Sequence, residues 1–278
     1  MNVDAELRRW VVQASERLAA AGVPSPRHDA EVLAAHAHGV ERSQLWRVRE
    51  LDGRFWTYVE RRARREPLQH LLGRAWFRRV ELAVGPGVFV PRPETEVVAG
   101  AAIDEARRLH RPVVVDLCTG SGAIALAVVD ECSHAEVHAV ELSPDSYAWA
   151  RRNLAGAGVD LRLGDMADAF AELDGTVDVV VSNPPYIPIG AVVRDPEVAA
   201  HDPALALWSG ADGLDAIRVV DGVAARLLRP GGLLVVEHAD AQGESVPELL
   251  RAGAGWRDVR DHLDLAGRPR FATARREP

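Results

Sequence analysis

The segment Asn183-Pro184-Pro185-Tyr186 carries the residues of this sequence that are best suited to chemistry. It follows the apolar run 177–182, which predicts a buried strand, and open α/β sheets bind ligands at the carboxyl ends of their strands. Proline has no N–H and a fixed φ, so the loop holds its carbonyl oxygens in place without joining a sheet. With the side-chain amide and the aromatic ring, these carbonyls predict a grip for an –NH2 group. A plain strand-ending turn is the alternative, because Asn-Pro often begins turns.

A second candidate site is the glycine-rich turn after residues 113–117, which also predict a strand. Gly120 and Gly122 allow the backbone to approach a ligand closely at the start of the next helix, where a Cβ would collide. The spacing Gly120-x-Gly122-x-x-Ala125 also fits the dinucleotide fingerprint. The turn therefore predicts a nucleoside-bearing cofactor and does not choose among such cofactors.

Acidic residues at the ends of three successive predicted strands favour S-adenosylmethionine over a nicotinamide cofactor. Asp116 can meet a cationic amino group or organise the turn, whereas a pyrophosphate would be repelled by it. Glu141, 25 residues further on, can bind both ribose hydroxyls, while Asp165 and Met166 are placed for the adenine amino group and ring face. Each acid alone could instead be a helix cap or a turn residue. The predicted cofactor-binding residues are Asp116, Cys118, Thr119, Gly120, Ser121, Gly122, Glu141, Asp165, Met166 and Asn183.

These loops belong to an alternation of strands and helices that begins at residue 113. Such alternation predicts an α/β fold with a doubly wound, mostly parallel sheet covered by helices on both faces. The predicted strands are 113–117, 136–141, 160–163, 177–182, 232–237, and a further pair near 257–261 and 270–274. We therefore predict one seven-stranded cofactor-binding domain over residues 93–278.

The start of the chain predicts a separate helical domain. Apolar residues recur at helical spacing within residues 4–66, and proline and glycine residues separate the segments. One such apolar face comprises Leu7, Trp10, Val11, Ala14 and Leu18. We place this small domain at residues 1–72 and expect it to dock the substrate.

Between the two domains the pattern is that of a β-hairpin. The runs 76–82 and 88–90 flank a Gly-Pro-Gly turn at 85–87, so we expect the hairpin to reverse there, within a linker over residues 73–92. A helix is then predicted from about Glu94 to His110, because an acidic first turn suits the helix dipole.

Charge is uneven along the 278 residues, which carry a net charge of −8 and no lysine. Residues 1–80 sum to +5 and residues 81–278 to −13. Nucleic-acid binders normally present a basic surface, so the acidic main part argues against a nucleic-acid partner. The basic first part could face an acidic partner, with a solvated helix face as the alternative.

Cysteine usage and hydropathy indicate a reducing, cytoplasmic setting. Cys118 and Cys132 are too few for a disulfide framework, and no Cys/His cluster suggests a metal. Residues 1–10 carry charges and lack the apolar core of a signal peptide. No run of roughly 18 apolar residues is free of charged or loop residues. We therefore expect neither a metal nor a membrane partner.

With these features, the segment 87–96 (Gly-Val-Phe-Val-Pro-Arg-Pro-Glu-Thr-Glu) makes the chain resemble the HemK/PrmC family. The segment 66–73 (Glu-Pro-Leu-Gln-His-Leu-Leu-Gly) is similar to the part that joins the two domains of that family. The resemblance implies a class I S-adenosylmethionine-dependent methyltransferase fold. It also implies methylation of the glutamine in the GGQ motif of class-1 peptide chain release factors. The Asn-Pro-Pro-Tyr motif alone is shared with DNA adenine methyltransferases, and the segment 87–96 is far more specific.

The sequence departs from the family pattern at four places, none of which removes a group that the chemistry needs. They are Cys118 for a frequent glycine, Glu141 for a frequent aspartate, His201-Asp202-Pro203 for an aromatic-Glu-Pro, and Glu237-His238-Ala239 without the glycine that often follows the histidine. The stretch 201–203 is therefore left without a predicted role.

The resemblance and the loop chemistry imply catalysis by orientation. The side-chain oxygen of Asn183 and the carbonyl of Pro184 each accept one N–H of the glutamine amide, which aims the nitrogen lone pair at the sulfonium methyl group and leaves S-adenosylhomocysteine as the product. Tyr186 packs on the amide plane. Phe89 encloses the reacting groups or faces the sulfonium, with a plain core position as its alternative. The predicted catalytic residues are Asn183, Pro184 and Tyr186, and the predicted substrate-binding residues are Asn183, Pro184, Pro185, Tyr186 and Phe89.

Four other functions remain open on sequence. A nucleic-acid adenine-N6 methyltransferase would share the loops but should be basic, and a ribosomal-protein glutamine methyltransferase would share the fold. A non-catalytic binding module would not need the Asn-Pro-Pro-Tyr loop, and a nicotinamide-dependent reductase would give that loop no task. We expect a class-1 release factor as the protein substrate, no direct contact with nucleic acid or membrane, and a monomer.

Overall fold

The computed structural model describes residues 3–253 and 255–278, which divide into two compact units. One unit is the chain up to Arg74 together with Val193–His201, and the other is Ala75–Val192 together with Asp202–Pro278. A short segment from the second half of the chain thus groups with the helices of the first part. No helix among the described residues is long and apolar enough to cross a membrane.

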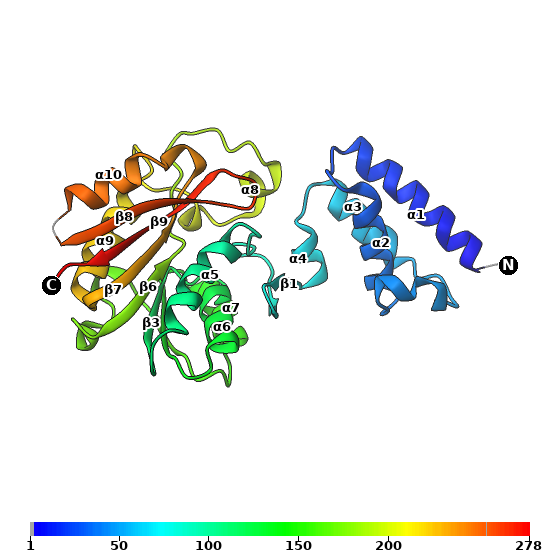
Figure 1. Ribbon diagram of the computed structural model, residues 1–278. Helices are drawn as coiled ribbons and strands as arrows, with labels where there is room; N and C mark the ends of the chain where they lie inside the picture. Colours follow the sequence, from blue (N-terminus) through cyan, green and yellow to red (C-terminus); the bar gives the residue numbers. More distant parts are fainter. Residues whose placement is uncertain (1–2, 254) are drawn as a thin grey trace. The chain divides into compact units, whose positions relative to one another are not determined.

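The first unit is built from helices, which are blue and cyan in Figure 1 except for the yellow-green α8. It comprises α1 (Val3–Ala20), α2 (Pro26–Ala37), the 3-10 helix η1 (Arg42–Arg47), α3 (Arg54–Ala63), α4 (Leu68–Leu72) and α8 (Pro196–His201). Leu7, Val11, Ala14 and Leu18 are buried on one face of α1, which confirms the predicted helical spacing. α2 begins with Pro26, whose missing N–H costs nothing at the first helical position.

A buried ion cluster ties α8 to the other helices of this unit. Arg62 Nε lies 2.8 Å from Asp29 Oδ2, and Arg62 Nη1 lies 2.9 Å from Glu197 Oε1. Arg65 Nη2 approaches the same Glu197 oxygen at 2.8 Å. The Arg62 and Asp29 side chains are only 5% and 6% exposed. Charges this deeply buried need partners, so the cluster fixes α8 on α2 and α3.

The hairpin forms, but its predicted turn was wrong. The strands are β1 (Arg74–Phe77) and β2 (Val80–Ala83), and the chain reverses at Arg78 and Arg79. Arg78 adopts a left-handed φ of 50°, which is uncommon for a residue other than glycine. Its guanidinium binds the Glu131 carboxylate and donates to the Glu96 carbonyl at 2.8 Å, so tertiary contacts hold this turn.

The Gly-Pro-Gly segment instead packs against α7 (Pro144–Asn153). A Cβ on Gly85 would lie 2.6 Å from the Trp149 ring, so only glycine fits there. Trp149 Nε1 donates to the Pro86 carbonyl at 3.2 Å, and Ser146 Oγ donates to the Gly87 carbonyl at 3.0 Å. The glycines therefore serve close packing, and residues 88–90 form no strand.

The second unit contains the predicted sheet of seven strands, in the order β5-β4-β3-β6-β7-β9-β8. The strands are β3 (Val113–Leu117), β4 (Glu136–Glu141), β5 (Asp160–Leu163), β6 (Val177–Ser182), β7 (Leu228–Glu237), β8 (Trp256–Leu263) and β9 (Pro269–Arg276). The first five run parallel, while β9 is antiparallel to both β7 and β8. The sequence-based strand positions are confirmed, with β7 starting earlier than residue 232.

Helices cover both faces of this sheet, as Figure 1 shows. α5 (Thr95–Ala106), α6 (Ala123–Glu131) and α7 share a core with Val114, Val179 and Val235. α9 (Asp215–Leu227) and α10 (Ser245–Ala252) share another core with residues of the same strands that point the other way, such as Val180 and Leu234. Successive strand residues face opposite sides, so these apolar runs must be covered twice. α5 ends at Ala106 rather than His110, and Arg111, the residue before Pro112, has a left-handed φ of 51°.

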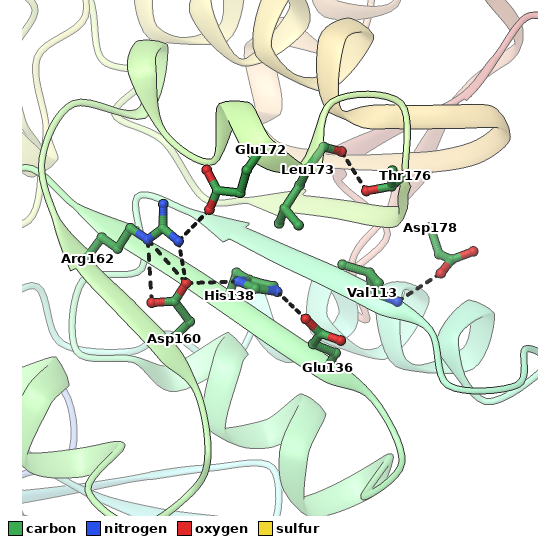
Figure 2. A network of polar contacts seen from close by, with 9 residues as sticks. All are labelled: Val113, Glu136, His138, Asp160, Arg162, Glu172, Leu173, Thr176 and Asp178. Carbon is green, nitrogen blue, oxygen red and sulfur yellow. Dashed lines mark hydrogen bonds and ion pairs between the residues drawn. The ribbon is translucent and has the colours of Figure 1, made fainter.

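A polar network occupies the amino-terminal half of strands β4 and β5 (Figure 2). His138 binds Glu136 Oε1 and Asp160 Oδ2, each at 3.1 Å. Arg162 joins Asp160 to Glu172 and lies 4.5 Å over the Phe170 ring. His138 is the third of the six residues of β4, and its partners Glu136 and Asp160 begin β4 and β5, so this histidine lies away from the carboxyl ends of the strands and has a structural role.

Candidate active site

The loops singled out in the sequence meet at one edge of the sheet. β3 lies between β4 and β6, and its last residue Leu117 is in register with both Val140 and Ser182. Glu141 is likewise in register with Leu163 at the end of β5. Because the strands are parallel, the loops that follow them emerge side by side.

The cofactor loop between β3 and α6 has three residues with left-handed backbone. Cys118, Gly120 and Gly122 have φ values of 61°, 58° and 84°. A Cβ on Gly120 would meet no atom within 4 Å, so this side of the loop is open, whereas a Cβ on Gly122 would come within 3.0 Å of Leu154. Gly120 therefore leaves the open side of the loop accessible, whereas Gly122 allows the loop to pack closely against Leu154.

The Asp116 side chain is hydrogen-bonded to residues of this loop and of α6. Its Oδ2 accepts hydrogen bonds from Thr119 Oγ1 at 2.6 Å and from the Ala125 N–H at 3.2 Å. Its Oδ1 is buried and has no hydrogen-bond partner among the described residues. Burial raises the pKa of Asp116 to about 7, and the nearby Glu141 charge acts in the same direction.

Glu141 joins the end of β4 to the cofactor loop. Its Oε2 accepts from the Gly120 N–H and its Oε1 from the Ser143 N–H, both at 2.8 Å. Burial raises the pKa of Glu141, and these N–H groups partly offset the effect. Each carboxylate oxygen can accept a second hydrogen bond, so the group can hold the loop and still receive a hydroxyl.

The residues after β5 are more exposed. Asp165 is exposed, and its Oδ1 caps the short helix η2 (Met166–Asp168) by accepting from the Ala167 N–H at 2.9 Å. Met166 Sδ lies 3.5 Å from Cys118 Sγ, which places the two loops in contact. Burial raises the pKa of the Cys118 thiol, with the Glu141 and Asp116 charges adding to it, so the thiol stays protonated.

The Asn183 side chain has a fixed direction. Its Nδ2 donates to the Oγ1 atom of Thr95 at 3.2 Å, and Thr95 is the first residue of α5. The amide oxygen Oδ1 is thereby left as the acceptor, next to the Pro184 backbone. Pro184 is buried and Pro185 is half-buried. The amide oxygen of Asn183 and the carbonyl of the next residue, Pro184, are the two acceptors that the sequence analysis predicts for this loop.

The hydroxyl and the backbone carbonyl of Tyr186 each meet a polar side chain. Its hydroxyl approaches Glu237 Oε1 at 3.5 Å, and its carbonyl accepts from Gln242 Nε2 at 3.2 Å. A Cβ on Gly213 would lie 2.4 Å from the same carbonyl, so the backbone packs closely there. Burial first, and the Glu237 charge second, raise the pKa of Tyr186, which therefore keeps its proton.

Comparison with known proteins identifies the family. Residues 9–73 match the model of the PrmC N-terminal domain, and residues 94–195 match the methyltransferase small domain. The chain is 60% identical to the release factor glutamine methyltransferase of Streptomyces coelicolor, over 96% of each protein. The chain belongs to the release factor glutamine methyltransferase family.

Other relatives of this methyltransferase are informative. The release factor glutamine methyltransferase of Mycobacterium tuberculosis is 47% identical, over 97% of this chain and 91% of that protein. A 4-amino-L-phenylalanine/4-methylamino-L-phenylalanine methyltransferase of Streptomyces pristinaespiralis is 46% identical, over 88% and 87%. A methyltransferase structure from Pyrococcus furiosus shares the fold, with a TM-score of 0.50 and 18% identity over 71% of this chain and 89% of that chain.

S-adenosylmethionine is the cofactor of this methyltransferase, and the residues present fit it. The loop is open beside Gly120, where backbone can approach a ligand. The partnerless Asp116 Oδ1 is suited to a cationic amino group, and the Glu141 carboxylate to ribose hydroxyls. Among the described residues, no group of His, Cys, Asp and Glu is arranged to hold a metal.

Phe89 has a neighbour that the sequence did not predict. The Arg92 guanidinium lies 4.8 Å from the centre of its ring, and the same arginine binds Asp202 Oδ2 at 2.7 Å. A cation therefore already covers one face of the half-buried ring. Asp202, which had no predicted role, anchors this arginine in the methyltransferase.

Sequence reasoning missed Thr95, Glu237 and Gln242. Glu237 ends β7 and is an acid at a strand end, like Asp116 and Glu141, so the same signal could have found it. Thr95 lies within the family segment 87–96 but was not singled out. Gln242 carried no signal in the sequence, because it belongs to none of the motifs.

Proposed function

We propose that the protein transfers a methyl group from S-adenosylmethionine to the side-chain amide nitrogen (N5) of the glutamine in the GGQ motif of class-1 peptide chain release factors. Membership of the family supports this, at 60% identity over 96% of the chain. The single structural observation that carries it is the Asn183 amide, whose nitrogen is bound to Thr95. Its oxygen is therefore left to accept an –NH2 group, together with the carbonyl of the next residue, Pro184.

When bound, S-adenosylmethionine supplies an electrophilic methyl group on a sulfonium. Asn183 Oδ1 and the Pro184 carbonyl each accept one substrate N–H and so fix the direction of the nitrogen lone pair. Orientation of this kind is worth up to about 7–11 kcal/mol in ideal cases. The same acceptors stabilise the positive charge that develops on nitrogen. His238, the histidine after β7, binds the Ala239 carbonyl and Asp261 and offers no free base.

The remaining residues have supporting roles in this proposal. Asp116 and Glu141 hold the amino group and ribose of the cofactor, together with the loop residues Cys118, Thr119, Gly120, Ser121 and Gly122. Asp165 and Met166 border the adenine, and Pro185, Tyr186 and Phe89 enclose the substrate amide.

We further propose that the helical part (residues 1–72) docks the release factor, that residues 73–92 form the linker, and that residues 93–278 carry the reaction. The charge of +5 over residues 1–80 supports docking of an acidic protein surface, and −13 over residues 81–278 speaks against direct binding of nucleic acid. The enzyme acts as a monomer in the cytoplasm, where release factors work.

A labelling experiment tests the function. The purified protein is incubated with methyl-labelled S-adenosylmethionine and a release factor carrying either GGQ or GGA. We expect label on the GGQ form only. Label on free 4-amino-L-phenylalanine, without label on GGQ, would instead assign the activity named for the Streptomyces pristinaespiralis relative. Label on DNA would point to a nucleic-acid methyltransferase.

The variant Asn183→Ala tests the proposed grip. It removes the amide oxygen and should lower kcat by about 100-fold or more. Affinity for S-adenosylmethionine, measured by calorimetry, should stay within about threefold, since orientation and not cofactor binding is lost. Unchanged turnover would contradict the role of Asn183.

A further inference from the structure

The helical unit carries a surface cavity that the proposed reaction does not use. It has a volume of about 210 Å³ and lies between α1, α2 and η1. Leu7 and Val11, which are buried on α1, and Leu45 and Trp46 of η1 form its apolar lining. Ligand pockets usually begin near roughly 300 Å³, so this smaller cavity is suited to a large side chain of a protein partner. We call it the Trp46 cavity.

Trp46 is more exposed than the other tryptophans of this unit. It is 63% exposed, whereas Trp10 and Trp56 pack with the ring of Phe55. The Arg47 guanidinium lies 5.8 Å from the centre of the Trp46 ring. Tryptophan and arginine are the residues that most often dominate the binding energy of protein interfaces. Together with the cavity beside it, the exposed ring therefore indicates an interaction surface.

Three arginines from three different elements line the same cavity, namely Arg8 of α1, Arg27 of α2 and Arg42 of η1. Arg8 Nη2 lies 2.9 Å from Asp4 Oδ2. Glu31 is shared, with Arg27 Nε at 2.6 Å and Arg42 Nη1 at 3.7 Å. Three arginines against two acids leave the lining with a net positive charge. The arginine side chains are more than half exposed, and such ion pairs contribute little to stability, so carboxylates of a partner can replace them at small cost.

We propose that the Trp46 cavity docks an acidic segment of the release factor, which inserts a large apolar side chain against Trp46 and places its carboxylates on the three arginines. Arginine and carboxylate form strong, paired hydrogen bonds, so the positive rim selects an acidic segment. The two acids of the rim would repel the continuous phosphate charge of a nucleic acid, which favours a protein partner.

The inference rests on the proposed function, because it takes a release factor as the protein substrate. It narrows the proposed docking part from residues 1–72 to one face made by α1, α2 and η1. The glutamine itself is bound by the Asn-Pro-Pro-Tyr loop of the other unit. Docking at the Trp46 cavity should therefore determine KM for the release factor and leave the methyl transfer itself unchanged.

The first variant is Trp46→Ala, which removes the exposed ring and leaves the buried core of the unit intact. We expect KM for the full-length GGQ release factor to rise by about tenfold, through the loss of an interface anchor. The kcat at saturating release factor and the calorimetric Kd for S-adenosylmethionine should each stay within about twofold. Trp76→Ala is the matched control, because Trp76 is 66% exposed on β1 and does not line the cavity. Its KM should equal that of the wild type.

The second variant is Arg42→Glu, which reverses a charge on the rim. It should raise KM for the release factor by about tenfold at low salt and by less at high salt, since exposed charges are screened. Arg64→Glu is its control, because Arg64 is exposed, follows α3 in the same unit and does not line the cavity. It should change KM by less than about twofold. A short GGQ peptide without the docking segment should have the same KM in all four variants.

The outcomes separate the two proposals. If the wild type fails to methylate GGQ, the proposed function falls, and the calorimetric Kd of the release factor for the same variants still tests the cavity. If the wild type methylates GGQ, but Trp46→Ala and Arg42→Glu keep its KM, only the docking cavity falls. Should Trp46→Ala fail to fold, Arg42→Glu and its control decide.

Three further results would overturn the docking cavity. An equal rise of KM in Arg64→Glu and Arg42→Glu would show that overall charge explains the binding. An equal rise of KM for the short peptide would place the effect at the glutamine site. Binding of a labelled RNA oligonucleotide that Arg42→Glu abolishes, at an unchanged KM for the release factor, would assign the cavity to RNA.

Discussion

Single residues determine the backbone of the cofactor loop. Cys118 adopts a φ of 61°, a conformation that costs an ordinary residue about 1–2 kcal/mol and glycine almost nothing. A glycine at this position would adopt the same conformation without strain. The Cys118 thiol contacts Met166 and so contributes some packing in return.

This conformation makes a testable prediction for Cys118. Cys118→Gly should keep the affinity for S-adenosylmethionine within about twofold, whereas Cys118→Val should weaken it by about tenfold or more, because a β-branched side chain is disfavoured at this φ. Calorimetric titration of both variants measures the difference. Equal affinities would show that the loop tolerates another backbone conformation.

The pH dependence of stability should reveal the charge on Glu237. Burial raises its pKa from 4.5 to about 7, against the effects of Thr95, Arg270 and Tyr186, while Glu94 acts in the raising direction. A carboxyl with a raised pKa contributes stability below pH 4.5, and this contribution is lost as the pH rises through about 7.

The variant Glu237→Gln has no ionisable group at this position, so it should not lose stability as the pH rises through about 7. We expect it to be more stable than the wild type at pH 8, by up to about 3 kcal/mol, and nearly equal to it at pH 5. Denaturant unfolding at both pH values checks the prediction, and a gain that is the same at both would refute it.

At the scale of elements, the sheet edge and the short helix α8 are connected. The loop that follows β6 continues through residues 187–192 into the segment Val193–His201, which belongs to the helical unit. There Glu197 binds both Arg62 and Arg65. The Asn-Pro-Pro-Tyr loop is therefore followed by a segment that buried ion pairs anchor.

Removing the ion pairs of Glu197 should destabilise the helical unit. Glu197→Ala leaves two arginines without this partner and should destabilise the unit by about 1–3 kcal/mol. Hydrogen exchange of residues 193–201 should accelerate, while the Kd for S-adenosylmethionine stays the same. Glu60→Ala is the control, because the Glu60–Arg17 pair is solvent-exposed and should matter little. Unchanged exchange in Glu197→Ala would contradict the anchor.

At the scale of the whole molecule, the cofactor site and the proposed docking surface fall in different units. All predicted cofactor-binding residues lie within Ala75–Val192, whereas the basic stretch of the chain lies mainly in the helical unit. Binding of the cofactor and binding of the release factor should therefore be separable.

Deletion of residues 1–72 tests this separation. The shortened protein should bind S-adenosylmethionine within about threefold of the full chain, while KM for the release factor rises by about tenfold or more. For a short GGQ peptide, which lacks the rest of the release factor surface, the deletion should raise KM much less. Equal losses for cofactor, peptide and release factor would show that the helical part serves folding instead.

Much of the fold and of the site could be predicted from local sequence. Apolar runs such as 113–117 and 177–182 mark buried strands, because both faces of a parallel sheet are covered. The loops after these strands then had to meet at one edge, which placed Asp116, Glu141 and Asn183 together. The stiffness of the prolines and the freedom of Gly120 are likewise properties of single residues.

The tertiary structure alone decided the features that depend on contacts between distant parts of the chain. The hairpin turns at Arg78 because that arginine meets Glu131, and the expected glycines are used to pack against Trp149. Thr95 accepts the hydrogen bond of Asn183 Nδ2 from 88 residues away, and Glu237 meets the Tyr186 hydroxyl from another strand. A hydrogen bond between distant residues leaves no period in the sequence, so only the folded chain shows that the nitrogen of the Asn183 amide binds Thr95.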